Sequence, residues 1–316
     1  MVYGYLYFHM SVQLLINALI YASMLMLIAE AHTLTYLTAD AFNFTVGPMA
    51  AIGAYVGFTW TKILGLQLYL GLPVAFTVCS LVGFLCCVLV VEPLLRRGRG
   101  PVLVTLALIG TGILLTGLTQ IYARWLLYAY SIWTSNFLLK AYDFAVGWVP
   151  GVFIVSTILA LTSVLLLERM LHGTLFGASL RAVVENVDLA MVQGVNPARV
   201  RWVSWTLAGG LAGLAGAYGS MWFRSSLDMG PVLMTGILAS CLLGGVDSLR
   251  GAAIGGLLQG VFEIFLVVGG QRVIGVWVGE YRPLVPIAMI ALAMYFRPQG
   301  LLGADPSGRQ KRRVSR

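Results

Sequence analysis

Charged residues are scarce in this chain of 316 residues, since only 10% are Asp, Glu, Lys or Arg and 59% are hydrophobic. A soluble domain is about a quarter charged and about half apolar. The chain therefore has too few charges to cover the exterior of a soluble globule, which excludes soluble enzymes and soluble binding proteins. A mean hydropathy of +0.89 indicates instead an all-α protein that crosses a membrane several times.

Reactive and metal-binding residues are few as well. The four cysteines all lie inside apolar runs, at Cys79, Cys86, Cys87 and Cys241. We expect them to be buried thiols, with neither a disulfide framework nor a zinc site. The three histidines lack the spacing of a catalytic triad or a metal site. Nucleotide-binding fingerprints are absent from the sequence too, so we predict no catalytic residue, no metal site and no cofactor; any ATP and Mg²⁺ would be bound by a partner.

Nine apolar segments are candidate membrane spans, since about 20 mostly apolar residues cross a hydrocarbon core of about 30 Å. They cover residues 10–28, 48–64, 66–91, 101–122, 148–167, 202–221, 231–246, 251–268 and 284–296. The segment 31–47 is too polar and too short to cross, so we predict irregular or re-entrant backbone there. Residues 1–303 are expected to form one membrane domain, followed by a basic cytoplasmic tail at 304–316.

The basic residues predict the orientation of these spans in the cell membrane, because Lys and Arg near span ends mark the cytoplasmic side. Three basic groups fall on one side, in the loop 96–99, the segment 168–201 and the tail. We therefore expect a cytoplasmic C-terminus and, with nine spans, an extracytoplasmic N-terminus. Lysine and arginine are absent before Lys62, so the basic region of a signal peptide is not expected.

A short pattern occurs twice. Gly47-Pro48 and Gly230-Pro231 each open an apolar helix, and proline suits the first helical turn. By the orientation above, the first of these helices runs outward and the second inward, as an inverted repeat requires. Residues 10–122 and 202–297 are therefore possible repeats with a solute path at their interface, the alternative being a chance match of two short motifs.

The longest polar interruption, residues 168–201, carries an amphipathic pattern. Apolar residues recur at helical spacing along it, at Leu180, Val183, Val184, Val187 and Met191. This spacing predicts one short helix that ends near Gly194. A helix of this kind docks into a groove of a partner protein or lies flat on lipid head groups, and the pattern alone favours neither.

At this point the sequence resembles the permease subunits of branched-chain amino acid ABC importers. The matches in the cytoplasmic segment are Gly177, Arg181-Ala182, Ala190, Gly194-Val195-Asn196 and Arg199-Val200. Further matches are Ala212-Gly213, Ala215-Gly216, Gly244-Gly245, Ser248, Gly251-Ala252, Gly255-Gly256 and residues 297–303, with Glu92-Pro93 and Asn43-Phe44 upstream. The resemblance covers nearly the whole chain. Thr45-Val46 and Asp247 depart from the family pattern, and these departures concern the solute more than the fold.

The resemblance implies that the segment 177–196 couples the membrane domain to a cytoplasmic ATPase. The residues implied in this contact are Gly177, Arg181, Ala182, Glu185, Ala190, Gly194 and Asn196. The implied partners are two ATP-binding subunits, a second permease subunit (a copy or a paralogue) and an extracytoplasmic substrate-binding protein. Membrane lipid surrounds the chain, and no nucleic acid partner is expected.

Glu263 is an ionisable residue inside the predicted span 251–268. Such a group normally faces a bundle interior or a water-filled path, so we expect it either to line the path or to bond two helices together. The translocation path is predicted from Asp40, Asn43, Gly47, Pro48, Gly230, Pro231 and Glu263. Small residues four apart, such as Gly209 and Gly213, are expected to let helix backbones approach closely.

The function that follows is a membrane subunit of an ATP-driven importer. The resemblance implies that it moves branched-chain or other small amino acids, with urea or short amides as alternatives. A rival interpretation is a self-sufficient secondary transporter or channel for a small polar solute, which would need no coupling segment. An intramembrane enzyme is a weaker rival, because no nucleophile–base pair is evident.

Overall fold

The computed structural model describes residues 2–297 and 299–303, and this part of the chain is almost entirely helical. The α-helices are α1 (Val2–Ala39), α2 (Val46–Phe58), α3 (Gly71–Cys86), α4 (Glu92–Arg96), α5 (Pro101–Tyr130), α6 (Gly151–Gly173), α7 (Leu175–Glu185), α8 (Val187–Val192), α9 (Pro197–Trp222), α10 (Met229–Gly244), α11 (Leu249–Val273) and α12 (Leu284–Phe296). Short π-helical turns (Thr59–Ile63 and Cys87–Val91) and 3₁₀ helices (Leu68–Leu70, Lys140–Tyr142 and Val276–Tyr281) adjoin them.

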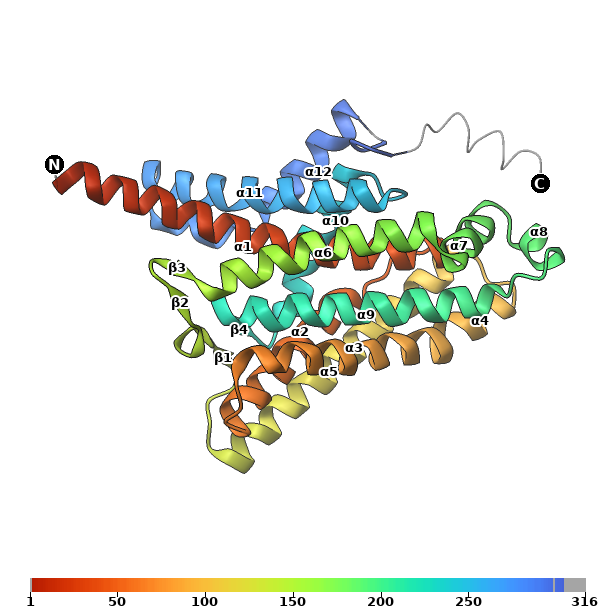
Figure 1. Cartoon of the computed structure of the whole chain (residues 1–316), viewed down its shortest axis with the longest axis horizontal. Helices are drawn as coiled ribbons and strands as arrows, with labels where there is room; N and C mark the ends of the chain where they lie inside the picture. Colours follow the sequence, from red (N-terminus) through yellow and green to blue (C-terminus); the bar gives the residue numbers. More distant parts are fainter. Residues whose placement is uncertain (1, 298, 304–316) are drawn as a thin grey trace.

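Four strands of two residues each form two antiparallel pairs. Strand β1 (Asn136–Phe137) pairs with β4 (Ser225–Ser226), and β2 (Ala145–Val146) pairs with β3 (Val149–Pro150). Figure 1 shows β1, β2 and β3 at one end of the molecule and α4, α7 and α8 at the opposite end, with most helices running between them. The basic loop 96–99 and the segment 168–201 therefore share one end, whereas the tail 304–316 lies outside the described residues.

The fold class is confirmed as an all-α membrane bundle, since five helical stretches are long and apolar enough to cross a bilayer. They are Val12–Ala39, Leu68–Arg96, Pro101–Tyr130, Gly151–Gly173 and Leu249–Val273. The helices α10 and α12 are apolar but shorter. Two further candidates, α2 with 13 residues and the glycine-rich α9, are mostly covered by neighbouring helices, so neither has to be long and apolar enough for lipid. The count of nine spans stays a prediction.

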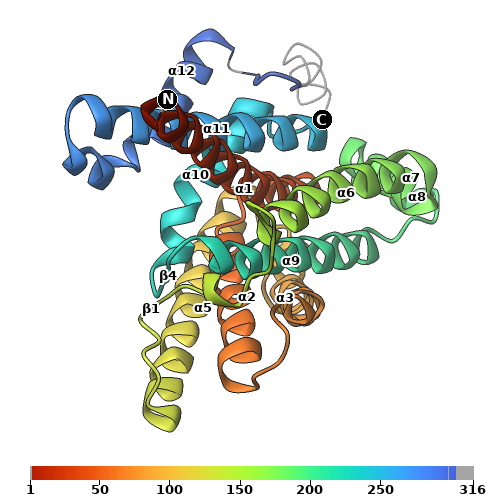
Figure 2. The same cartoon turned by 60° about the vertical axis from the view of Figure 1, so that its left-hand side comes forward.

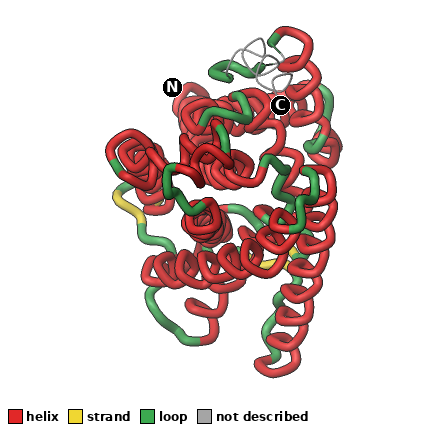
Figure 3. The backbone as a smooth tube through the Cα atoms, turned by 90° about the vertical axis from the view of Figure 1, so that its right-hand side faces the viewer, coloured by secondary structure: helices red, strands yellow, loops and turns green. Residues whose placement is uncertain are grey.

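The centre of the bundle is formed by α1 and α9. Helix α1 packs along α11 and α9, and α9 also packs against α2 and α3. Figure 2 shows α2 and α5 side by side at the edge of this core. Figure 3 looks along the bundle, so that several helices are seen end-on around the central ones. The four cysteines are buried and unpaired, as expected.

Small residues bring these central helices into backbone contact. A Cβ added at Gly216 would lie 1.7 Å from the carbonyl oxygen of Ala50 on α2. One added at Gly209 would lie 2.2 Å from the carbonyl oxygen of Cys79 on α3. Between α11 and α1, a Cβ added at Gly260 would lie 2.3 Å from the Cα of Ala22. The close packing predicted for the spaced small residues is confirmed.

The prediction of irregular backbone over residues 31–47 is wrong for most of that segment. Helix α1 continues to Ala39, and only residues 40–45 are non-helical before α2. The polar side chains of the last turns do not break the helix, because they bond back to its own carbonyl groups. The Thr35 hydroxyl donates to the carbonyl of His32 at 2.8 Å, and that of Thr38 donates to the carbonyl of Thr35 at 3.0 Å.

Candidate functional site

The two Gly-Pro helix starts meet inside the bundle. A Cβ added at Gly47 would lie 2.4 Å from the carbonyl oxygen of Gly230, and one added at Gly230 would lie 2.9 Å from the backbone nitrogen of Pro48. Glycine, which has no Cβ, allows two backbones to come this close. The first turns of α2 and α10, which carry the positive ends of the helix dipoles, therefore converge although they are far apart in the sequence. Pro48 is buried and Pro231 is exposed.

A cavity of about 260 Å³ lies beside the start of α10. Much of its wall is apolar, formed by Met24, Met229, Val232, Leu233, Pro283 and Pro286. Glu263 of α11 and Arg282 of the loop before α12 line the same cavity. Glu263 therefore shares this cavity with residues of the first two turns of α10, whereas Gly230 and Pro231, predicted for the path, do not line it.

Glu263 is held by contacts from two segments. The Nε of Arg282 lies 2.6 Å from its Oε1, and the Nε2 of Gln259 lies 3.4 Å from its Oε2. The Arg282 guanidinium also lies over the ring of Tyr21, 4.4 Å from its centroid. The carboxylate therefore bonds α11 to the loop before α12 and lines a cavity, so the two roles considered for it are compatible.

Asn43 and Asp40 lie away from this cavity. Asn43 is buried, and its Oδ1 accepts hydrogen bonds from the backbone N–H (2.9 Å) and the hydroxyl (2.6 Å) of Thr45. Its backbone oxygen lies 3.3 Å from the Nδ1 of buried His32. These bonds shape the turn that leads into α2. Asp40 is exposed at the end of α1, with a positive φ of 52°.

The prediction of one amphipathic helix in the segment 168–201 is wrong. The chain forms α7 and α8 with a break at Asn186, whose backbone is extended and whose Oδ1 accepts from the N–H groups of Asp188 (3.0 Å) and Leu189 (3.1 Å). An asparagine side chain in this position starts a new helix. As a result Leu180 and Val183 are buried, and the rest of the predicted stripe is exposed, namely Val184, Val187 and Met191.

The residues predicted for the ATPase contact lie within α7 and α8 or directly after them. Gly177 is packed so closely that an added Cβ would lie 2.1 Å from the carbonyl oxygen of Leu171, and the Arg181 guanidinium donates to that same carbonyl. Asn196 caps α9 by accepting from the N–H of Ala198 at 3.0 Å. Of the remaining members, Ala190 is buried, Ala182 is half-buried, Glu185 and Gly194 are exposed, and Gly194 has a positive φ of 83°.

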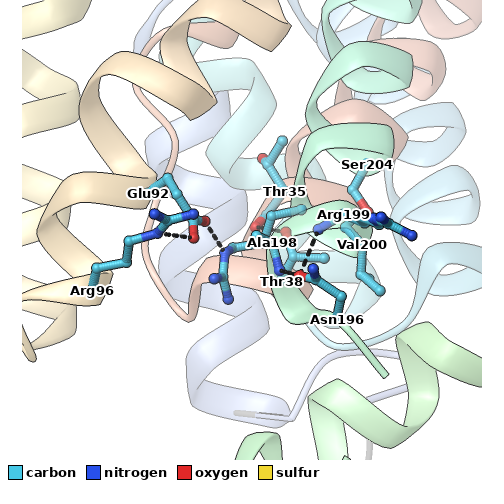
Figure 4. A network of polar contacts seen from close by, with 10 residues as sticks. Thr35, Thr38, Glu92, Arg96, Asn196, Ala198, Arg199, Val200 and Ser204 are labelled. Carbon is cyan, nitrogen blue, oxygen red and sulfur yellow. Dashed lines mark hydrogen bonds and ion pairs between the residues drawn. The ribbon is translucent and has the colours of Figure 1, made fainter. Parts of the chain in front are cut away.

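A buried ion-pair network behind this segment was not predicted. Glu92, at the start of α4, accepts from Arg201 of α9 at 2.8 Å and from Arg96 at 2.9 Å. Figure 4 shows Glu92 and Arg96 facing the start of α9, where Asn196 and Ala198 lie. The ion pair between Glu92 and Arg201 ties α9 to the start of α4. Its only signal in the sequence is the Glu92-Pro93 match.

A further buried carboxylate, Glu30 of α1, was missed because the first span was expected to end at residue 28. Its Oε2 accepts from the hydroxyl of Ser163 on α6 at 2.7 Å, and its residue is 1% exposed. This contact holds the middle of α6 against α1. Within residues 2–297 and 299–303, His, Cys, Asp and Glu side chains form no group of three or more that could hold a metal ion.

Comparison with known proteins gives consistent matches over nearly the whole chain. The family described as branched-chain amino acid transport system / permease component matches residues 14–294. The probable branched-chain amino acid transport permease protein LivH of Methanocaldococcus jannaschii is 31% identical, over 92% of this chain and 91% of that protein. The high-affinity branched-chain amino acid transport system permease protein BraD of Pseudomonas aeruginosa is 27% identical, over 92% of this chain and 95% of its own.

The fold also has a relative among solved structures. The structure of PsaBC from Streptococcus pneumoniae in complex with Fab contains a chain that superposes with a TM-score of 0.51. The match covers 95% of this chain and 97% of that one, at 14% identity. At this identity the likeness concerns the arrangement of helices alone.

Proposed function

The chain belongs to the branched-chain amino acid transport system permease family, and from this premise we propose that it is the membrane-spanning subunit of an ATP-driven importer. Its cargo is a branched-chain amino acid or another small amino acid. Two ATP-binding subunits supply the energy, a second permease subunit completes the membrane part, and an extracytoplasmic substrate-binding protein delivers the cargo.

The observation that carries this proposal is the exposed apolar surface of α7 and α8. Val184, Val187 and Met191 are 41%, 38% and 51% exposed, at the end of the molecule that also carries the basic loop 96–99 (Figure 1). An apolar helix face beyond the spans fits a groove in a cytoplasmic protein. The residues around it are those that the family resemblance assigns to the ATPase contact.

Movement of this segment has a direct route into the bundle. Asn196 joins α8 to α9 by capping α9, and α9 is the helix that packs against α1, α2 and α3. A push on α7 and α8 would shift α9 and, through it, the meeting point of Gly47 and Gly230. We place the solute path at that point and along the Glu263 cavity, with the first turns of α2 and α10 at its centre. Asn43 shapes the entry to α2, and Asp40 lies at its cytoplasmic approach.

The experiment that tests this function is uptake of radiolabelled L-leucine by proteoliposomes that contain the chain with its ATPases, second permease and binding protein. We expect uptake that requires ATP and is unaffected by collapse of the proton gradient. Purified alone, the chain is expected neither to bind nor to hydrolyse ATP. Uptake driven by a proton gradient without ATP would support the secondary transporter instead. Urea uptake without leucine uptake would overturn the proposed cargo.

A further inference from the structure

Three charged side chains, Glu263, Arg282 and Arg224, line the largely apolar cavity beside α10. The side chain of Glu263 is 3% exposed and that of Arg282 is 36% exposed, and both line the cavity. Around them lie Met24, Leu233 and Pro286, with exposed Arg224 also bordering the space. A carboxylate taken out of water, as that of Glu263 is, is expensive to maintain. A purely structural contact between α11 and the following loop could be made by apolar side chains, so the pair calls for a chemical reason.

The charges define the chemistry of a ligand that would fit. A molecule with one ammonium and one carboxylate could enter between Glu263 and Arg282 and replace one ion pair by two. The net charge of the cavity would not change, and no buried charge would lose its partner. An amine alone would leave the partly exposed Arg282 without its carboxylate. A carboxylate alone would draw Arg282 away from Glu263, which is the more unfavourable case because the Glu263 side chain is 3% exposed.

The neighbouring side chains suit this exchange. The ring of Tyr21, 4.4 Å from the Arg282 guanidinium, keeps a cation–π contact with Arg282 when Glu263 is released. The planar guanidinium matches a carboxylate with two parallel hydrogen bonds.

The size of the cavity agrees with a small aliphatic amino acid. A volume of about 260 Å³ lies just below the roughly 300–1,000 Å³ of typical small-ligand sites, which suits a ligand as small as an amino acid. The methionine, leucine, valine and proline side chains of the wall would surround its apolar part. Figure 1 shows that α10, α11 and α12, which frame this space, lie together beside α1.

We propose that this cavity binds an aliphatic zwitterionic amino acid, with Glu263 receiving the α-ammonium group and Arg282 the α-carboxylate. The ion pair between the two side chains is the resting state, which the amino acid opens on entry. This inference rests on the proposed function, because it states how the cargo of that permease is held.

The test is protection of a cysteine placed in the cavity. The chain's four cysteines are all buried, so Thr235→Cys, which lines the cavity, supplies the reactive thiol, and Ser131→Cys in an exposed loop supplies the control. The nucleotide-free complex with its ATPases and second permease, without binding protein, is labelled with N-ethylmaleimide. Leucine is added, or 3-methylbutylamine, which lacks the carboxylate, or 4-methylpentanoate, which lacks the amine.

We expect leucine to slow labelling at Thr235→Cys and not at Ser131→Cys, with neither singly charged analogue protecting at the same concentration. In the Glu263→Gln background, the leucine concentration that halves the labelling rate should rise about tenfold or more, as expected for the loss of a charged hydrogen bond. In the same background, the ratio of the 4-methylpentanoate concentration to the leucine concentration that halves the labelling rate should fall. The matched control is Glu168→Gln, which removes the carboxylate of another ion pair of α11, Glu168–Arg250, and should leave protection unchanged.

Three outcomes would overturn the inference: no labelling at Thr235→Cys, no protection by leucine, or equal protection in the Glu263→Gln and parent backgrounds. If Glu263→Gln fails to assemble, Arg282→Lys decides the matter, because it keeps the charge but loses the planar fork. Unchanged leucine protection in Arg282→Lys would then contradict the proposal. ATP-driven leucine uptake together with absent protection would refute this site alone, whereas absent uptake of any amino acid would refute the proposed function.

Discussion

Arg201 reaches Glu92 across 109 positions of the sequence, and both side chains are nearly buried, at 10% and 6% exposure. Loss of one partner from such a pair leaves a buried charge and costs about 3–5 kcal/mol. We therefore expect Glu92→Gln to lower the thermal unfolding midpoint of the purified protein strongly. Arg96→Ala is the control, since the Arg96 side chain is 66% exposed and a surface pair contributes less than about 1 kcal/mol. If Glu92→Gln with Arg201→Met is no more stable than Glu92→Gln alone, an unpaired charge is not the cause.

Single residues differ in how far the sequence could predict their role. The repeated Gly-Pro pattern marks both Gly47 and Gly230 in the sequence, and the structure brings them into close contact, whereas the inverted repeat stays a prediction. The partner of Glu263 could not be read, because Arg282 follows the end of α11 and returns to it through a 3₁₀ helix. Glu92 and Arg201 posed the same difficulty, since an ion pair between distant elements leaves no periodic signal.

Among the elements, α7 and α8 show where periodicity misleads. The apolar residues at helical spacing from Leu180 to Met191 predict one helix, yet the Asn186 side chain bonds to the N–H groups of Asp188 and Leu189 and starts a second one. A capping residue inside a periodic stretch is the signal that was overlooked. In α1 the opposite occurred, since the polar composition of residues 31–47 suggested irregular backbone, whereas the hydroxyls of Thr35 and Thr38 bond within the helix.

The exposed part of this stripe provides the test of docking. Val184→Asp with Val187→Asp should preserve the membrane fold, because both side chains are exposed, and should release the co-purifying ATPase by placing charges in an apolar contact. Val146→Asp, at a valine on β2 at the opposite end that is even more exposed, should leave the ATPase bound. The measurement is the ratio of ATPase to permease after affinity purification. An unchanged ratio in the double variant would favour a helix that lies on lipid head groups.

At the scale of the whole molecule, composition predicted the class of protein. The basic loop 96–99 and the segment 168–201, which were expected on one side of the membrane, lie at one end of the molecule (Figure 1), and the side that faces the cytoplasm stays a prediction. The count of crossings was harder to derive, because hydropathy measures suitability for lipid. Helix α9 contacts mainly protein, and its backbone approaches α2 and α3 at Gly216 and Gly209. A helix in this position is selected for small residues, so its apolar signal is weaker than that of α5, whose side chains are largely exposed.

Labelling of single cysteines tests the orientation of the whole chain. Arg97→Cys, in the basic loop, and Gln193→Cys, after α8, are both exposed positions at the end of the molecule that carries α4 and α7. Gln193 is preferable to Gly194, whose positive φ of 83° would strain a cysteine. Because basic residues favour the cytoplasmic side, a membrane-impermeant maleimide should label both only in inverted vesicles, whereas Lys140→Cys should react in intact cells. The buried native cysteines should give no background. In the predicted topology, α5 makes the one crossing between α4 and the 3₁₀ helix Lys140–Tyr142. Reaction of Arg97→Cys and Lys140→Cys from the same side would require an even number of crossings there. That result would also remove the opposed helix directions on which the inverted repeat depends.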